Sequence, residues 1–271
     1  MKLLLCSLAA ASTLVLTNTA QAQSQPGLPE LRTTFRLQGF LPQSTTSSRI
    51  EGYDFVNFNS SRAPGTSASV EDDYGLSGHK PAFGLAFTRR LGENWRFDLE
   101  YLEQRRTASN VSLRRDIQVY DSSYPAGTAV NTRMAFSALR IAGGYTLLRQ
   151  NATEFGVSFG GLISRYDLSV TAAGRSPTNY DDIDPQASVG LFLSSAISPA
   201  LRLQGRVEVG PRNRQMNVGA NWRFAAHASL GADVRWMSVK IEQSVGQLYT
   251  FNNACADFKL LGPQLYLEVG F

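Results

Sequence analysis

Two groups of carboxylates are the parts of this 271-residue chain whose residue types and spacing could support chemistry. The groups are Glu71, Asp72 and Asp73 close to His79, and Asp181, Asp182 and Asp184. Paired carboxylates can activate a water molecule for hydrolysis, and clustered carboxylates also suit Ca²⁺ or Mg²⁺. Acidic side chains in loops are in most proteins simply solvated. Which of these alternatives holds depends on the elements that position the two groups.

The amino-terminal residues predict a secretory signal peptide. Lys2 is followed by an apolar segment, 3–16, that is too short to span a bilayer, and the small residues of 20–22 suit a cleavage site. We therefore predict a cleaved signal peptide over 1–22 and a single mature domain over 23–271.

The composition of the mature chain argues against several classes of protein. Without Lys2, one of 26 basic residues, the chain keeps 25 against 22 acidic residues, a balance that gives no reason to expect nucleic acid as a partner. Cys255 is its only cysteine, so no intramolecular disulfide or paired-cysteine metal site can form, and we expect no metal and no cofactor. No mature segment approaches 18 uncharged apolar residues, so the exported protein is either soluble or a transmembrane β-barrel.

Alternation with a period of two residues decides between those two classes. In 95–101, aromatic and aliphatic residues alternate with Arg96, Asp98 and Glu100, and 201–209 repeats the pattern. The charged faces of such segments also carry Gly and Ala, which suits a narrow polar lumen enclosed by a lipid-facing wall. An exported soluble β-sandwich is the alternative.

The segments and their connections predict an all-β, transmembrane, antiparallel, up-and-down β-barrel. The ten expected strands are 31–41, 80–90, 95–106, 130–147, 153–168, 186–197, 200–210, 215–225, 228–242 and 258–271. The short turns are 91–94, 148–152, 197–200 and 225–228, and the long exterior loops are 42–79, 105–129, 169–186 and 243–257. An even strand number leaves both ends of the chain in the periplasm. Strand-like runs at 49–58 and 111–119 keep twelve strands open, and eight is the other alternative.

The last strand carries a specific signal. Its residues Leu265, Leu267, Val269 and Phe271 would face lipid, and the strand must pair with the first one because an open edge in hydrocarbon is costly. A strand that ends on Phe resembles the insertion signal of Gram-negative outer-membrane proteins, which implies recognition by the barrel assembly machinery.

The charged faces predict a network of ionic side chains inside the barrel. Its expected members are Arg36, Arg96, Arg202, Arg206, Arg223, Arg235, Asp98, Glu100, Glu208, Asp233 and Glu268. A ten-stranded barrel is narrow, and unpaired charges in it would carry a large desolvation cost. We therefore expect the charges to pair and plug the lumen, with a narrow ion path as the alternative.

Four motifs carry a resemblance to known proteins: 70–76, 96–106, 124–128 and 262–271. With them the mature chain resembles a group of uncharacterised proteobacterial outer-membrane barrels that is loosely placed with the OmpA/OmpW-like membrane-anchor barrels. This resemblance implies the fold and location but no activity. OmpW-like barrels are similar to eight-stranded forms with an apolar lumen, whereas the lumen predicted here is charged.

Two enzymatic resemblances are weaker. Omptin-type outer-membrane proteases use an Asp pair and an Asp–His pair at the outer rim, and this chain has no Asp-x-His motif near its carboxylates. The run 227–229 resembles the His-x-Ser of outer-membrane lipid A deacylases, but Leu230 stands where an Asn is expected, and the run falls in a periplasmic turn.

We therefore expect a monomeric outer-membrane barrel, not an enzyme and without catalytic residues, whose exterior loops contact the surroundings or lipopolysaccharide. Outer-membrane lipid would surround it. The alternatives are a narrow channel for ions or small solutes and a rim hydrolase that acts as a protease or modifies lipid A.

Overall fold

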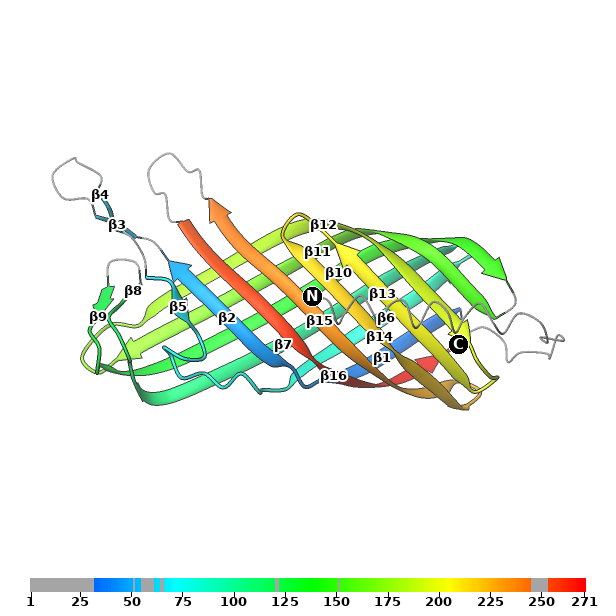
Figure 1. The fold of residues 1–271 in the computed structure, drawn as a ribbon, viewed down its shortest axis with the longest axis horizontal. Coiled ribbons are helices and arrows are strands. Elements are labelled where there is room, and N and C mark those ends of the chain that lie inside the picture. Colours follow the sequence, from blue (N-terminus) through cyan, green and yellow to red (C-terminus); the bar gives the residue numbers. More distant parts are fainter. Residues whose placement is uncertain are drawn as a thin grey trace, which may run out of the picture.

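The computed structural model describes residues 32–50, 52–54, 61–63, 66–119, 122–150, 152–244 and 253–271. The predicted signal peptide lies outside these residues. Ten strands follow one another around a closed antiparallel barrel (Figure 1). They are β1 (Thr33–Phe40), β6 (Ala82–Leu91), β7 (Trp95–Ser112), β10 (Ala129–Gln150), β11 (Thr153–Ala172), β12 (Thr178–Ala196), β13 (Leu201–Val209), β14 (Asn213–Ala225), β15 (Ala228–Ser244) and β16 (Asn253–Gly270). The predicted fold class and strand number are confirmed.

The barrel closes where the terminal strand meets the first one. β1 pairs with β16 from Thr34 opposite Gly270 to Phe40 opposite Gln264. The backbone N–H of Phe271 donates to the carbonyl of Thr33 at 2.9 Å, so hydrogen bonding continues to the last residue. This pairing leaves no open edge at the level of the membrane.

The first strand is interrupted and then continues as β2 (Gln43–Ile50), which pairs with the outer half of β16. Pro42 has no N–H to donate, and a Cβ on Gly262 would lie 2.1 Å from the carbonyl oxygen of Leu41, so the two backbones approach closely here. The remaining strands are short: β3 (Gly52–Asp54) with β4 (Ser61–Ala63), β5 (Ala68–Ser69) on β2, and β8 (Ile117–Val119) with β9 (Ser122–Tyr124). They lie at the outer end and do not raise the strand number to twelve (Figure 1).

Several strands extend beyond their predicted ends. The expected strand 95–106 runs to Ser112, and the expected loop 169–186 is wrong, because β11 and β12 continue through it to a turn at 173–177. Gly174 adopts a φ of +73° in that turn. The extra residues lie outside the apolar belt, where the outward face of a strand is polar, so a search for lipid-facing residues does not detect them.

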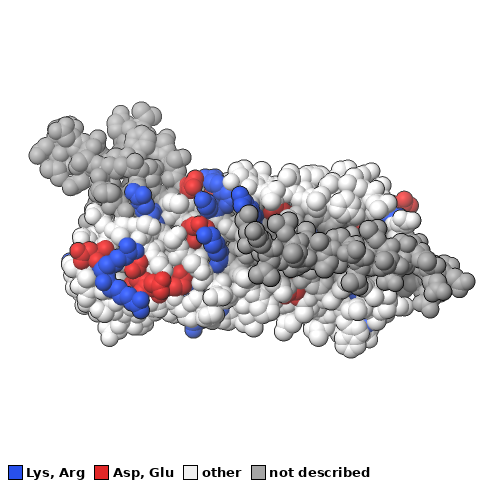
Figure 2. Space-filling view, viewed as in Figure 1, with Lys and Arg blue, Asp and Glu red and all other residues white. Residues whose placement is uncertain are grey.

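An apolar belt surrounds the periplasmic half of the barrel. On β16 it runs from Leu261 to Phe271, ten residue steps, which gives a height of about 23 Å at about 3.3 Å per residue and a tilt of about 45°. Trp95 and Trp222 are half exposed beside the periplasmic turns, as interfacial aromatic residues are. Beyond the belt the outer surface is charged, and Figure 2 shows the charges gathered toward the end that carries the loops.

In the described part of the chain, no helix has the length and apolar character needed to cross a membrane.

Candidate functional site

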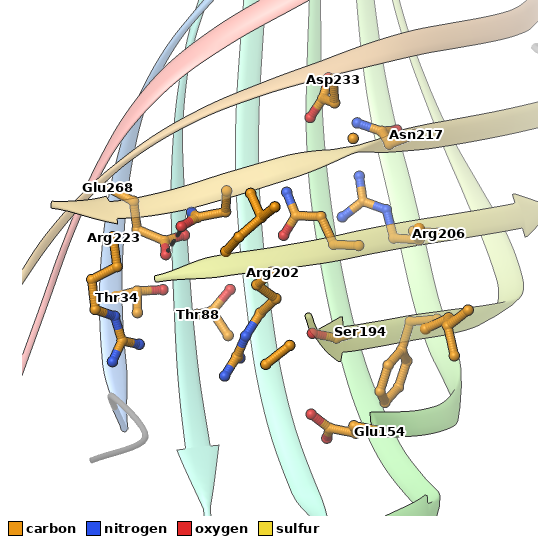
Figure 3. A pocket seen from close by; sticks show the side chains of 18 of the residues that line it. Thr34, Thr88, Glu154, Ser194, Arg202, Arg206, Asn217, Arg223, Asp233 and Glu268 are labelled. Atoms are coloured by element: carbon orange, nitrogen blue, oxygen red, sulfur yellow. Dashed lines mark hydrogen bonds between the residues drawn. The ribbon is translucent and has the colours of Figure 1, made fainter. Parts of the chain in front are cut away.

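The lumen holds three layers, beginning with a cavity at the periplasmic end. The cavity has a volume of about 1050 Å³. Residues 197–200 of the turn between β12 and β13 line it at one end, and Glu100, Arg206 and Asp233 line it in the middle of the barrel. Figure 3 shows the side chains of Arg202 and Arg223 pointing into it from β13 and β14. The cavity therefore opens toward the periplasm and ends inside the barrel.

Ion pairs line the wall of this cavity. Arg36 donates to Glu268 at 2.8 Å, and its guanidinium lies 3.9 Å from the centre of the Tyr266 ring. Arg96 pairs at 2.8 Å with Asp98, two residues further along the same strand. Because alternate residues of a strand share a face, the alternation in the sequence is enough to place these charges inside the barrel.

The second layer closes the cavity and consists of Glu100, Arg140, Arg206, Glu208 and Arg235, which we name the ion-pair layer. The Nε of Arg140 donates to Glu208 at 2.7 Å, and both side chains are almost fully buried. Glu100 accepts from Arg206 at 2.7 Å and also pairs with Arg235. Charges in a site of low dielectric constant are stable only when they are paired and hydrogen-bonded, so this layer is held in one arrangement.

Amide side chains add hydrogen bonds to that layer, although Nη1 of Arg140 and Nε of Arg206 and Arg235 are buried without a hydrogen-bond partner among the described residues. Gln38 donates to Glu100 at 3.1 Å, Gln264 donates to Gln38 at 2.7 Å, and Arg235 donates to Gln215 at 3.3 Å. These contacts join β1, β7, β14, β15 and β16 across the lumen.

The third layer packs apolar side chains in the outer half of the lumen, where Arg106, Thr132 and Ser164 are also buried. Phe136, Tyr166, Met237, Val239 and Phe258 have no exposed surface, and we name them the apolar layer. The rings of Phe136 and Phe258 stack with their centroids 4.5 Å apart, and Tyr166 meets Phe258 edge-on at 5.0 Å. These ring contacts pack the lumen at this level.

Residues 66–81, which we name the inserted segment, cover the space between β2 and β7 in the outer half. Val70, Tyr74 and Leu76 are buried against the apolar layer. The backbone N–H of Val70 donates to Thr46 at 2.9 Å, and that of Ser44 donates to Gly78 at 2.7 Å. The segment thus takes the place of a regular strand in this part of the wall.

Two ion pairs hold the inserted segment. Glu71 accepts from Arg106, whose side chain is fully buried, and Asp73 accepts from Arg115 at 2.5 Å. Burial acts to raise the pKa of Asp73, but the hydrogen bonds from Arg115 and from the backbone N–H of Ser69 outweigh it. The pKa of this carboxyl therefore lies below its ordinary value of 3.8. Burial raises the pKa of the Tyr74 phenol.

The residues predicted to line the lumen all point into it. Nine of them line the cavity: Arg36, Arg96, Asp98, Glu100, Arg202, Arg206, Arg223, Asp233 and Glu268. Glu208 and Arg235 lie in the ion-pair layer. Leu265, Leu267, Val269 and Phe271 face outward in the belt; their role as an insertion signal stays a prediction.

The two carboxylate groups do not form the clusters that their spacing suggests. Asp182 and Asp184 point inward from β12 while Asp181 points outward, so placing them together in a loop is wrong. Asp181 pairs with Arg165 at 3.0 Å, and Asp184 pairs with Arg212 at 2.9 Å. Among the described residues no group of three or more His, Cys, Asp or Glu side chains is arranged to hold a metal ion.

Arg140 and the apolar layer were not predicted from the sequence. On β10, Arg140 alternates with outward residues and points inward together with Ala138 and Ala142. This alternation is the signal that could have identified it. Arg106 was missed in the same way, because its strand was expected to end there.

A closed barrel with an apolar belt and a charged lumen defines an integral outer-membrane β-barrel. No family model and no curated protein matches the chain. Among solved structures it is similar to the outer membrane protease OmpT from Escherichia coli, with a TM-score of 0.56, 11% identity, 93% of this chain and 100% of that chain covered. A second similar structure is the translocator domain of the autotransporter NalP from Neisseria meningitidis, with a TM-score of 0.45 and 10% identity over 98% of this chain and 96% of that chain. A third is Ail, the attachment invasion locus protein of Yersinia pestis, with a TM-score of 0.39 and 6% identity over 87% of this chain and 99% of that chain. The likeness to OmpT shows the fold, and the protein is an outer-membrane barrel.

Proposed function

We propose that this protein is a closed, non-conducting barrel that anchors a protruding outer portion in the membrane, and that it has a surface-interaction role without enzymatic activity. The observation that carries the proposal is the apolar layer. Phe136, Met237 and Phe258 have no exposed surface, although they face the interior of a membrane barrel. Ions crossing this layer would have to leave water, which costs many kcal/mol.

Conductance across a planar bilayer tests the closed state. We expect inserted protein to give no steady single-channel steps in 1 M potassium chloride. Steady steps that disappear in Arg206→Gln or Glu208→Gln protein would contradict the proposal, because they would assign an ion path to the ion-pair layer.

A narrow channel is the second candidate, and the cavity of about 1050 Å³ favours it. The cavity ends at Glu100 and Arg206, which pair at 2.7 Å. A conducting state would need both the ion-pair layer and the apolar layer to rearrange.

The rim carboxylates support the non-enzymatic proposal because four of the six in the two groups pair with an arginine. Glu71, Asp73 and Asp181 pair with Arg106, Arg115 and Arg165 respectively. Asp184 pairs with Arg212, whereas Asp72 and Asp182 accept from Ser69 and Tyr180. A carboxylate held by a guanidinium is a weak base for the activation of water. Turnover of peptides or lipid A by the purified barrel would oppose the proposal if Asp73→Ala or Asp181→Ala abolished it.

A further inference from the structure

The outward faces of β14, β15, β16 and β2 carry a row of cations and hydroxyl groups directly above the apolar belt. The register places Arg214 opposite Ser238, Ser238 opposite Lys259, and Lys259 opposite Thr45. In the row below, Trp236 lies opposite Leu261 at the edge of the belt. Neighbouring strands are about 4.8 Å apart, so Arg214 and Lys259 lie about 10 Å from each other with the Ser238 hydroxyl between them.

A second row continues this surface outward. Lys240 lies opposite Asp257, and Asp257 lies opposite Ser47. Lys259 approaches Asp257 at 3.5 Å. Within the described part of the chain, the side chains of Arg214 and Lys240 make no ion pair, and both are exposed. We name Arg214, Lys240 and Lys259 the basic patch; with Asp257 its net charge is +2.

The opposite side of the barrel at the same height is arranged differently. The outward charges of β7, β10, β11 and β12 there are Glu103, Arg105, Arg133, Arg165, Asp167 and Asp181. Their net charge is zero, and several pair with one another: Arg105 with Glu103 at 2.5 Å and Arg165 with Asp181 at 3.0 Å. Of the two sides compared, only the one with the basic patch therefore carries an excess of cations.

We propose that the basic patch binds the phosphate groups of a phosphorylated glycolipid in the outer leaflet, such as the lipid A portion of lipopolysaccharide. Two exposed cations without an ion pair complement phosphate, and the hydroxyl groups of Ser238 and Thr45 can donate hydrogen bonds to its oxygens. The apolar surface of Trp236 and Leu261 immediately below suits acyl chains. A free phosphate would use only the upper half of this surface, so an amphiphile fits it better.

This inference rests on the membrane location within the proposed function, and its test is independent of conductance. Binding of purified lipid A to the barrel in nanodiscs of neutral phospholipid would be measured for three proteins. They are the unchanged protein, a patch variant with Arg214→Gln, Lys240→Gln and Lys259→Gln, and a control variant with Arg105→Gln, Arg133→Gln and Arg165→Gln. Heat-dependent migration on gels checks that each variant is folded.

We expect the patch variant to bind lipid A about 10- to 100-fold more weakly, because each lost cation weakens attraction to anionic lipid several-fold. The control variant should bind within about 3-fold of the unchanged protein, and dephosphorylated lipid A should not distinguish the three proteins. Equal weakening in both variants would overturn the inference, as would patch-variant binding equal to that of the unchanged protein. A conducting barrel that still lost lipid A binding in the patch variant would contradict the proposed function and leave this inference standing.

Discussion

The periplasmic half of the lumen holds charges around a cavity, whereas the outer half is packed mainly with aromatic and aliphatic side chains around the buried Arg106. The outward face of the wall shows the reverse arrangement. Leu265 and Leu267 face outward in the belt, while Asp257 and Lys259 face outward beyond it. Along β16 the apolar residues therefore change sides, because Phe258 and Leu260 point inward.

This change of sides shows how one barrel can be stable with lipid around one half and water around the other. Where lipid surrounds the wall, the outward residues must be apolar, and the interior can be polar and partly hydrated. Where water surrounds the wall, the outer half needs a buried core like that of a soluble protein, and its interior supplies one. The inserted segment contributes to that core. We therefore attribute the proposed closure of the lumen to the length of the strands beyond the membrane.

The largest effect should come from breaking the ion-pair layer. In Arg140→Leu protein, Glu208 is left buried without its main partner, so we expect the free energy of unfolding to fall by about 4 kcal/mol. Urea unfolding in detergent micelles or vesicles measures it. The double variant Arg140→Leu with Glu208→Leu should recover most of the loss.

The matched control for that experiment is the exposed pair of Arg165 and Asp181. Arg165→Leu should cost less than about 1 kcal/mol, because exposed ion pairs are screened by water. Equal losses at Arg140 and Arg165 would mean that the layer inside the lumen is hydrated and not buried.

The apolar layer should respond somewhat less strongly. Phe136→Ala removes a ring that stacks on Phe258 and leaves a cavity, so we expect a loss of about 3 kcal/mol in the free energy of unfolding. Thr107→Ala on the exposed outward face of β7 should change it by less than about 0.5 kcal/mol. If Phe136→Ala were as mild as Thr107→Ala, the outer half would not contain a packed core.

Much of this comparison follows from the sequence, and part of it does not. Alternation and the final Phe predicted ten strands and the inward direction of Arg36, Glu100 and Glu208. Lipid-facing apolar residues mark only the membrane part of each strand, so the pattern predicted an end of β7 at 106 and a loop around Asp182. The strands continue there, with their apolar residues on the inward face. The burial of Val70 and Tyr74 depends on tertiary contacts with strands distant in the chain, which no local pattern contains.

The smallest effect concerns the inserted segment in acid. Because the pKa of Asp73 is lowered on folding, its carboxylate stabilises the segment above about pH 4, and this contribution is lost as the pH falls through the folded pKa, below 3.8. Hydrogen exchange corrected for intrinsic rates should show the amide of Ser69 losing protection on acidification. In Asp73→Asn protein, protection should be weaker at neutral pH and nearly independent of pH; an unchanged acid response would assign the effect to another group.

The most direct test of the account is the side from which the cavity can be reached. Ser194→Cys lines the cavity, and in a Cys255→Ser background it would be the only thiol within residues 23–271. A small charged thiol reagent would be added to either side of proteoliposomes whose orientation is fixed by protease access to the exterior loops, with exposed Cys255 of the unchanged protein as the exterior control. We predict that Ser194→Cys reacts only from the periplasmic side, and comparable reaction from the exterior would contradict the closed lumen.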